Sequence, residues 1–187
     1  MNFVLWVISV IDITDVKRQE LAALITTRFM QPLVGGSVKT AVCRVVAEND
    51  SFQPGRFDAV VFLTTIGFRG AGSIMKRAGE TPEEALAHEE IKGLTDAFMQ
   101  GGGIAEVYWN RCDLLSNVAA AIFHEAGHLK FRSRTENSMH NARGHNGIPV
   151  AVLAAVSHNT ILPNSADLEV FKSKIGNVVP LRNTVPQ

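Results

Sequence analysis

The stretch from Asp113 to Phe131, DLLSNVAAAIFHEAGHLKF, places the tightest limit on what this chain can fold into. At about 100° per residue, its larger apolar side chains fall on one narrow stripe, which predicts an amphipathic helix that buries this stripe against a core. The stripe consists of Leu115, Val118, Ala119, Ile122, Ala126 and Leu129. His124 and His128 lie almost opposite the stripe on the same helical wheel, so we expect them on an exposed face of the helix.

These two histidines belong to the pattern H-E-x-x-H, formed by His124, Glu125 and His128. Histidines four residues apart lie one above the other on a helix, so their imidazoles can converge on one ion. The small neighbours Ala120 and Ala121 leave room for it. Two neutral imidazoles suit Zn²⁺, and a catalytic zinc keeps three protein ligands and a water. The pattern therefore predicts zinc as a cofactor, with His124 and His128 as ligands.

Glu125 is the residue after His124, so it is rotated off the histidine face by about 100°. From there it can reach a zinc-bound water instead of the metal. Zinc lowers the pKa of such a water to about 7, so a neighbouring carboxylate can take its proton at neutral pH. Glu125 can then pass the proton to a leaving amine. The predicted function is hydrolysis of a peptide bond with Glu125 as general base, and the predicted partner is a peptide or protein substrate.

A third zinc ligand must come from elsewhere in the chain. Residues 132–147 are polar and contain glycine, and we expect them to leave the helix and fold back across its exposed face. This favours His140 as the third ligand and leaves His145 as the alternative. The wider set of downstream candidates is Glu136, His140, His145, His158, Asp167 and Glu169. A second donor to the oxyanion is also needed, and its candidates are Tyr108, Arg134, Arg143 and His145.

Composition bounds the other classes of function. The 187 residues have 46% hydrophobic and 19% charged side chains and a formal net charge of zero. This balance is typical of a globular protein and gives no electrostatic case for a nucleic acid or an acidic membrane as partner. Cys43 and Cys112 are the two cysteines, and we expect free thiols and no disulfide framework. The oligomeric state is left open.

The apolar run at residues 3–11 has no basic residue before it and no small-residue cleavage site after it. It therefore predicts a strand and not a signal peptide. No apolar run reaches transmembrane length. The expected location is the cytoplasm, and delivery by a non-classical route is left open.

Periodicity and turn signals predict strands and helices in alternation. The expected strands are residues 3–12, 38–47, 57–66 and 104–109, and the expected helices are residues 15–30, 81–100, 113–131 and 165–175. Thr14 or Asp15 caps the first of these helices, which Pro32 stops. Thr81-Pro82-Glu83-Glu84 forms a capping box for the second, and Asp113 caps the third.

This order predicts an α/β (α+β) fold with a mixed four-stranded sheet packed against helices. We expect one domain over residues 1–187, in which residues 1–131 form the sheet and the active-site helix. We expect residues 132–187 to form a small C-terminal helical lobe.

The segment His124-Glu125-Ala126-Gly127-His128 resembles the signature of the zincin metallopeptidases. The resemblance implies two histidine ligands, a glutamate base and a zincin-like fold. A sheet that leads into the active-site helix is similar to the metzincin group, and Asn137-Ser138-Met139-His140 resembles its methionine turn. The extended metzincin motif has glycine and a third ligand where this chain has Phe131 and Arg134. A third histidine about a dozen residues further on is more like the SprT-like or other minimal zincins, so the resemblance names the clan and no family within it.

Three other interpretations remain open. A fourth protein ligand, with His145 joining His140, would make the zinc structural and the protein a non-catalytic interaction domain. A zinc hydrolase of a non-peptide amide fits the same residues. A plain α/β binding domain with an accidental motif needs no metal.

In the peptidase interpretation, the strand at 104–109 or 57–66 pairs with an extended substrate if it lies at the sheet edge.

Overall fold

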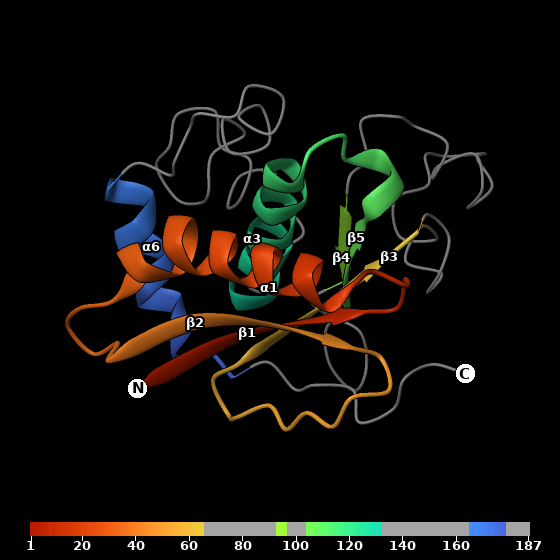
Figure 1. Ribbon diagram of the computed structural model, residues 1–187. Helices are drawn as coiled ribbons and strands as arrows, with labels where there is room; N and C mark the ends of the chain where they lie inside the picture. The colour runs from red at the N-terminus through yellow and green to blue at the C-terminus, as the bar shows by residue number, and fades with distance from the viewer. Residues whose placement is uncertain (66–92, 97–103, 132–164, 179–187) are drawn as a thin grey trace, which may run out of the picture.

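The computed structural model describes residues 1–65, 93–96, 104–131 and 165–178 of the chain (Figure 1). Its elements are, in order, β1 (Asn2–Ser9), α1 (Asp15–Ile25), η1 (Thr26–Met30), η2 (Gln31–Leu33), β2 (Thr40–Ala47), β3 (Ala59–Thr64), β4 (Gly93–Asp96), β5 (Ile104–Tyr108), η4 (Trp109–Arg111), α3 (Leu115–Phe131) and α6 (Ser165–Ile175). No helix among these residues is both long and apolar enough to cross a membrane.

The strands form one five-stranded sheet in the order β2-β1-β3-β5-β4. The first four strands in this order are parallel to one another, whereas β4 pairs antiparallel to β5. The predicted α/β class and the mixed sheet are confirmed, but the sheet has one strand more than expected. Among the strands that the structure describes, β2 and β4 are at the edges, so β3 and β5, the two strands considered for substrate pairing, are both interior.

Strand β4 lies inside the predicted helix at residues 81–100, and that prediction is wrong for residues 93–96. Gly93 and the β-branched Thr95 are weak helix formers, and four residues pair with β5 from Gly93↔Val107 to Asp96↔Ile104. A capping box reports only local preference, whereas this strand exists because a partner strand lies beside it. The rest of the predicted helix lies outside the described residues.

Helices α1, α3 and α6 all lie on the same face of the sheet (Figure 1). Alternate strand residues bury their side chains beneath them, as the period of two along a strand requires. The sheet's contribution to this core is Phe3, Leu5, Val7, Ala41, Cys43, Ala59, Val61, Leu63, Ala105 and Val107. A smaller cluster of Trp6, Ile8 and Val60 lies on the other face. Neither Cys43 nor Cys112 is part of a disulfide, as predicted.

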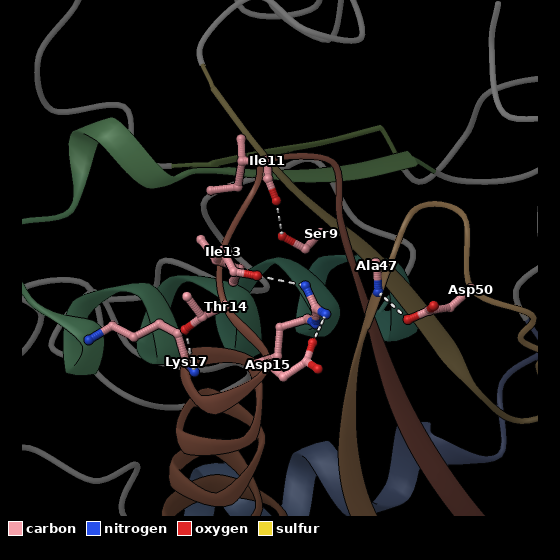
Figure 2. Close-up of polar contacts among 9 residues, drawn as sticks. Ser9, Ile11, Ile13, Thr14, Asp15, Lys17, Ala47 and Asp50 are labelled. Carbon is pink, nitrogen blue, oxygen red and sulfur yellow. Dashed lines mark hydrogen bonds and ion pairs between the residues drawn. The ribbon is translucent and has the colours of Figure 1, made fainter.

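Helix α1 begins where the sequence predicts it. The Thr14 hydroxyl accepts a hydrogen bond of 3.3 Å from the Lys17 amide, and Arg18 donates to the Ile13 carbonyl (2.6 Å) and pairs with Asp15 (Figure 2). Regular α-helical bonding ends at Ile25, and the π-helix η1 continues to Met30. Pro32 lies in the 3₁₀ turn η2 that follows, so it marks the end of this helical segment, as expected.

Two side chains cover part of the outer edge of β2. The Cys43 amide donates to the Thr26 hydroxyl over 2.9 Å, and Thr26 is the first residue of η1. The Ala47 amide donates to the Asp50 carboxylate over 2.8 Å (Figure 2). These amides point away from β1, and each donates to a side chain of the same chain instead of to water or to another strand.

Helix α3 buries the stripe predicted for it. Val118, Ala119, Ile122, Ala126 and Leu129 are each at most 1% exposed. The helix begins at Leu115, and the Leu114 carbonyl accepts from the Val118 amide, so the capping position falls one residue after the predicted Asp113.

Helix α6 has the predicted bounds and belongs to the same core as the sheet. Its Phe171 stacks on Phe123 of α3 with ring centroids 4.8 Å apart. Phe171 also contacts Phe3 of β1, at 6.3 Å between centroids.

Candidate functional site

Helix α3 brings the two histidine rings together. The Nε2 atoms of His124 and His128 are 3.0 Å apart, and the ring planes meet at 82°. The spacing of four residues accounts for this arrangement because successive helical turns stack such side chains. At Zn–N distances of about 2.0–2.1 Å, two ligands of a tetrahedral ion lie roughly 3.3 Å apart. The observed separation therefore fits a shared ion after a small adjustment of the rings.

The predicted exposure of this face is wrong. His124 is 1% exposed and His128 is 8% exposed. The reason lies in the other residues of α3, because Ala120, Ala121 and Phe123 are buried as well. A helix that is apolar around most of its circumference is enclosed on all sides. The single predicted stripe did not include these two alanines or Phe123.

Asn117 lies on the same face of α3, about two turns before His124. It is 5% exposed, and in the part of the chain that the structure describes its Oδ1 has no hydrogen-bond partner. A buried acceptor without a donor costs about 1–3 kcal/mol. The histidine face therefore carries a polar group that packing alone leaves unsatisfied. The sequence pattern gave no role to Asn117.

The carboxylate of Glu125 is held against the edge strand β4. It is 5% exposed, and its Oε2 accepts a hydrogen bond of 2.5 Å from the Thr95 hydroxyl. The same hydroxyl lies 3.2 Å from the main-chain oxygen of Glu125. Burial raises the pKa of Glu125 to about 8, and the bond from Thr95 opposes that rise. Glu125 can therefore gain and lose a proton close to neutral pH.

Gly93 gives Glu125 the space that it occupies. A Cβ atom at position 93 would lie 2.7 Å from the Glu106 carbonyl oxygen, 2.8 Å from Glu125 Cγ and 2.9 Å from Glu125 Oε1. Sequence reasoning missed both Gly93 and Thr95 because it placed them in a helix. The available signal was a glycine and a β-branched residue two positions apart, which is an unfavourable pair for a helix interior.

A second acidic side chain lies on β5. Glu106 and Tyr108 are fully buried, and the Tyr108 hydroxyl donates to Glu106 Oε2 over 3.3 Å. Burial raises the pKa of Tyr108, and the charge of Glu106 adds to this effect. Tyr108 is thus a neutral phenol that donates its hydrogen bond to Glu106. Its role as oxyanion donor, like the roles of Arg134, Arg143 and His145 outside the described residues, stays a prediction.

The structure brings no candidate third ligand to the histidine pair among the residues that it describes. His140, His145, Glu136 and His158 lie outside them, and the described ranges hold no group of three or more histidine, cysteine, aspartate or glutamate side chains that could bind a metal. Glu169 is an exposed residue of α6 that pairs with Lys172 over 2.7 Å. This position excludes it as a partner of the buried histidine pair.

The described residues thus assemble two imidazoles, a buried carboxylate and the strand that holds it. Comparisons of the chain with protein-family models, curated proteins and solved structures found no match. The chemistry of this site is therefore what indicates a function.

Proposed function

We propose that the protein is a zinc-dependent metallopeptidase. The observation that carries this proposal is the 3.0 Å approach of His124 Nε2 to His128 Nε2, with the buried carboxylate of Glu125 one residue from His124. His140, or His145 in its place, completes the ligand set in this proposal. The zincin clan, which the sequence resembles, uses the same residue types in the same spacing.

A zinc ion held by His124, His128 and His140, or His145 in its place, would supply a bound water of pKa about 7 and would polarise the scissile carbonyl. Glu125 would accept a proton from that water and donate it to the leaving amine. Its raised pKa suits both roles, because a carboxyl group near neutrality can take up a proton and release it in the same cycle. A cation beside Glu125 would lower this pKa from about 8 toward the working pH.

An extended peptide fits the architecture around Glu125. Strand β4 is the end of the sheet and its residue Thr95 contacts Glu125 directly. A peptide that adds to the outer edge of β4 binds through main-chain hydrogen bonds, with little demand on its sequence. This edge favours a peptide over a small non-peptide amide as substrate.

Substitution of Glu125 tests the proposal. Wild type and Glu125→Gln are loaded with zinc, dialysed, analysed for metal and assayed on quenched fluorescent peptides and casein. We expect the variant to lose activity by about 100-fold or more, since general base catalysis contributes 10²–10⁴-fold, and to keep its zinc. Glu20→Gln, on the exposed side of α1, is the matched control and should leave activity unchanged. Equal hydrolysis by wild type and Glu125→Gln would contradict the proposal.

The burial of His124 also supports a second candidate, a zinc-stabilised interaction domain without catalysis. A closed ligand set leaves no position for water, and a histidine with 1% exposure suits such a site. Retained zinc with no hydrolysis of peptides or of small amides would establish this alternative. Failure to retain zinc would overturn both candidates.

A further inference from the structure

We propose that Thr95 is a positioning residue for Glu125, so that the edge strand of the sheet sets the orientation of the catalytic base. This inference rests on the proposed peptidase function and deepens it. Thr95 touches neither histidine in the described contacts; its role is exerted through the Glu125 carboxylate.

The first observation is the hydrogen bond itself. Thr95 Oγ1 lies 2.5 Å from Glu125 Oε2, within the range of strong bonds from a hydroxyl to a carboxylate. The contact joins residues 30 positions apart, on β4 and on α3. Because Glu125 is buried, water is a poor substitute for this donor.

The second observation comes from Gly93, two residues before Thr95 on the same face of β4. The missing side chain at Gly93 lets Glu125 Cγ and Oε1 lie against the strand, where a Cβ atom would come within 2.9 Å of both. One carboxylate oxygen is thus bonded to Thr95, and the other lies over Gly93. Two contacts of different kinds fix the rotation of the carboxylate.

Glu125 is thus attached to β4, the same strand whose outer edge is proposed to bind the substrate. Strand β4 has four residues, and two of them hold Glu125. A peptide that pairs with the same four residues is therefore placed in register with the base. Such placement matters because misplacing a reacting group by about 1 Å can cost about 100-fold in rate.

The kinetic test compares Thr95→Val, which has the same shape without the hydroxyl, with Thr95→Ser, which keeps it. For zinc-loaded protein acting on a fluorogenic peptide, we expect kcat to fall about 10- to 100-fold in Thr95→Val, with KM and zinc content within about twofold of wild type. Thr95→Ser should restore kcat to within about threefold of wild type. Thr40→Val, at the exposed start of β2, is the matched control.

A second readout needs neither zinc nor activity. Urea unfolding of the metal-free wild type, Thr95→Val, Glu125→Leu and the double variant forms a cycle in which effects of interacting residues do not add. Leucine at position 125 leaves no acceptor for the Thr95 hydroxyl. We expect the double variant to be less destabilised than the sum of the two single variants.

The outcomes separate this inference from the function on which it rests. If wild type hydrolyses peptide but Thr95→Val keeps its kcat, or Thr95→Ser is as slow as Thr95→Val, the positioning role is overturned and the peptidase function stands. Additive effects in the unfolding cycle also overturn it. A zinc-loaded wild type without hydrolysis overturns the peptidase function, and the role of Thr95 with it.

Discussion

Lys130 lies near the C-terminal end of α3 with its surface fully buried. Its ammonium group donates to three main-chain carbonyls, those of Phe57 (2.5 Å), Asn177 (2.9 Å) and Ile175 (3.1 Å). Burial lowers the pKa of Lys130 to about 8, and the nearby Asp58 carboxylate opposes this shift. The three donors of one side chain thus connect α3 to the start of β3 and to the end of α6.

Replacing Lys130 should destabilise the fold strongly. In Lys130→Met three carbonyls lose their donor, that of Ile175 in a buried contact and those of Phe57 and Asn177 in part-buried ones. We expect a loss of about 3 kcal/mol in the free energy of unfolding. Urea unfolding followed by circular dichroism measures it. Lys172→Met is the control, because its pair with the exposed Glu169 should contribute less than about 1 kcal/mol. If Lys130→Met lost no more free energy of unfolding than Lys172→Met, the contacts of Lys130 would contribute no more than an exposed ion pair, which would contradict this prediction.

Glu125 gives the metal-free protein a pH dependence with a definite sign. Its pKa is about 8 in the folded chain against a reference value of 4.5, so between these values the folded state holds a proton that the unfolded state has released. The free energy of unfolding should therefore fall as pH rises from about 4.5 to 8. Urea midpoints at pH 5 and pH 8, with a chelator present, test this for wild type and Glu125→Gln. We expect a smaller fall in the variant; the same fall in both would exclude Glu125 as its source.

Residue spacing in the sequence predicts the convergence of His124 and His128 because both lie on one regular helix. It does not predict the bond from Thr95 to Glu125 or the three acceptors of Lys130. Those partners come from strands and from a helix that are distant in the chain, and their proximity depends on how the elements pack. Local patterns contain no information about that packing.

Strand β4 is the element in which sequence and structure differ most. The pattern around it favours a helix, and its strand form depends on pairing with β5. By contrast, β1, β2, β3, β5, α3 and α6 have strong patterns of their own and were predicted to within a few residues. Short edge strands with glycine are the elements for which tertiary contacts outweigh local propensity.

Gly93→Ala tests how closely β4 is fitted to Glu125. The added methyl group would meet the Glu106 carbonyl oxygen at 2.7 Å, and that backbone atom has little freedom to move. We expect a loss of about 1–3 kcal/mol in the free energy of unfolding and, for the zinc-loaded enzyme, a lower kcat. Thermal unfolding and peptide kinetics measure the two effects. Gly55→Ala is the control, because a Cβ atom at position 55 would lie 3.4 Å from its nearest neighbour, an oxygen of the Asp58 carboxylate. Gly36→Ala is unsuitable because Gly36 has a φ of 56°, which strains any other residue. A Gly93→Ala protein as stable and as active as the control would contradict this fit.

At the scale of the whole molecule, the alternation of strands and helices predicts a sheet with helices packed on it. It does not predict that all three described α-helices lie on one face, or that β1 is interior while β2 and β4 are edges. The order of strands follows from long-range pairing. This order decides which strand lies beside Glu125, and so it decides the arrangement of the candidate site.

The β2 edge of the sheet bears on how copies of the protein behave toward one another. Along β2, the Cys43 and Ala47 amides are already occupied by Thr26 and Asp50. Unsatisfied amides on an exposed edge are what recruit a neighbouring molecule into a continuous sheet. Self-association through β2 is therefore discouraged by two short side chains, and the protein can be concentrated with less risk of fibril-like aggregation from that side.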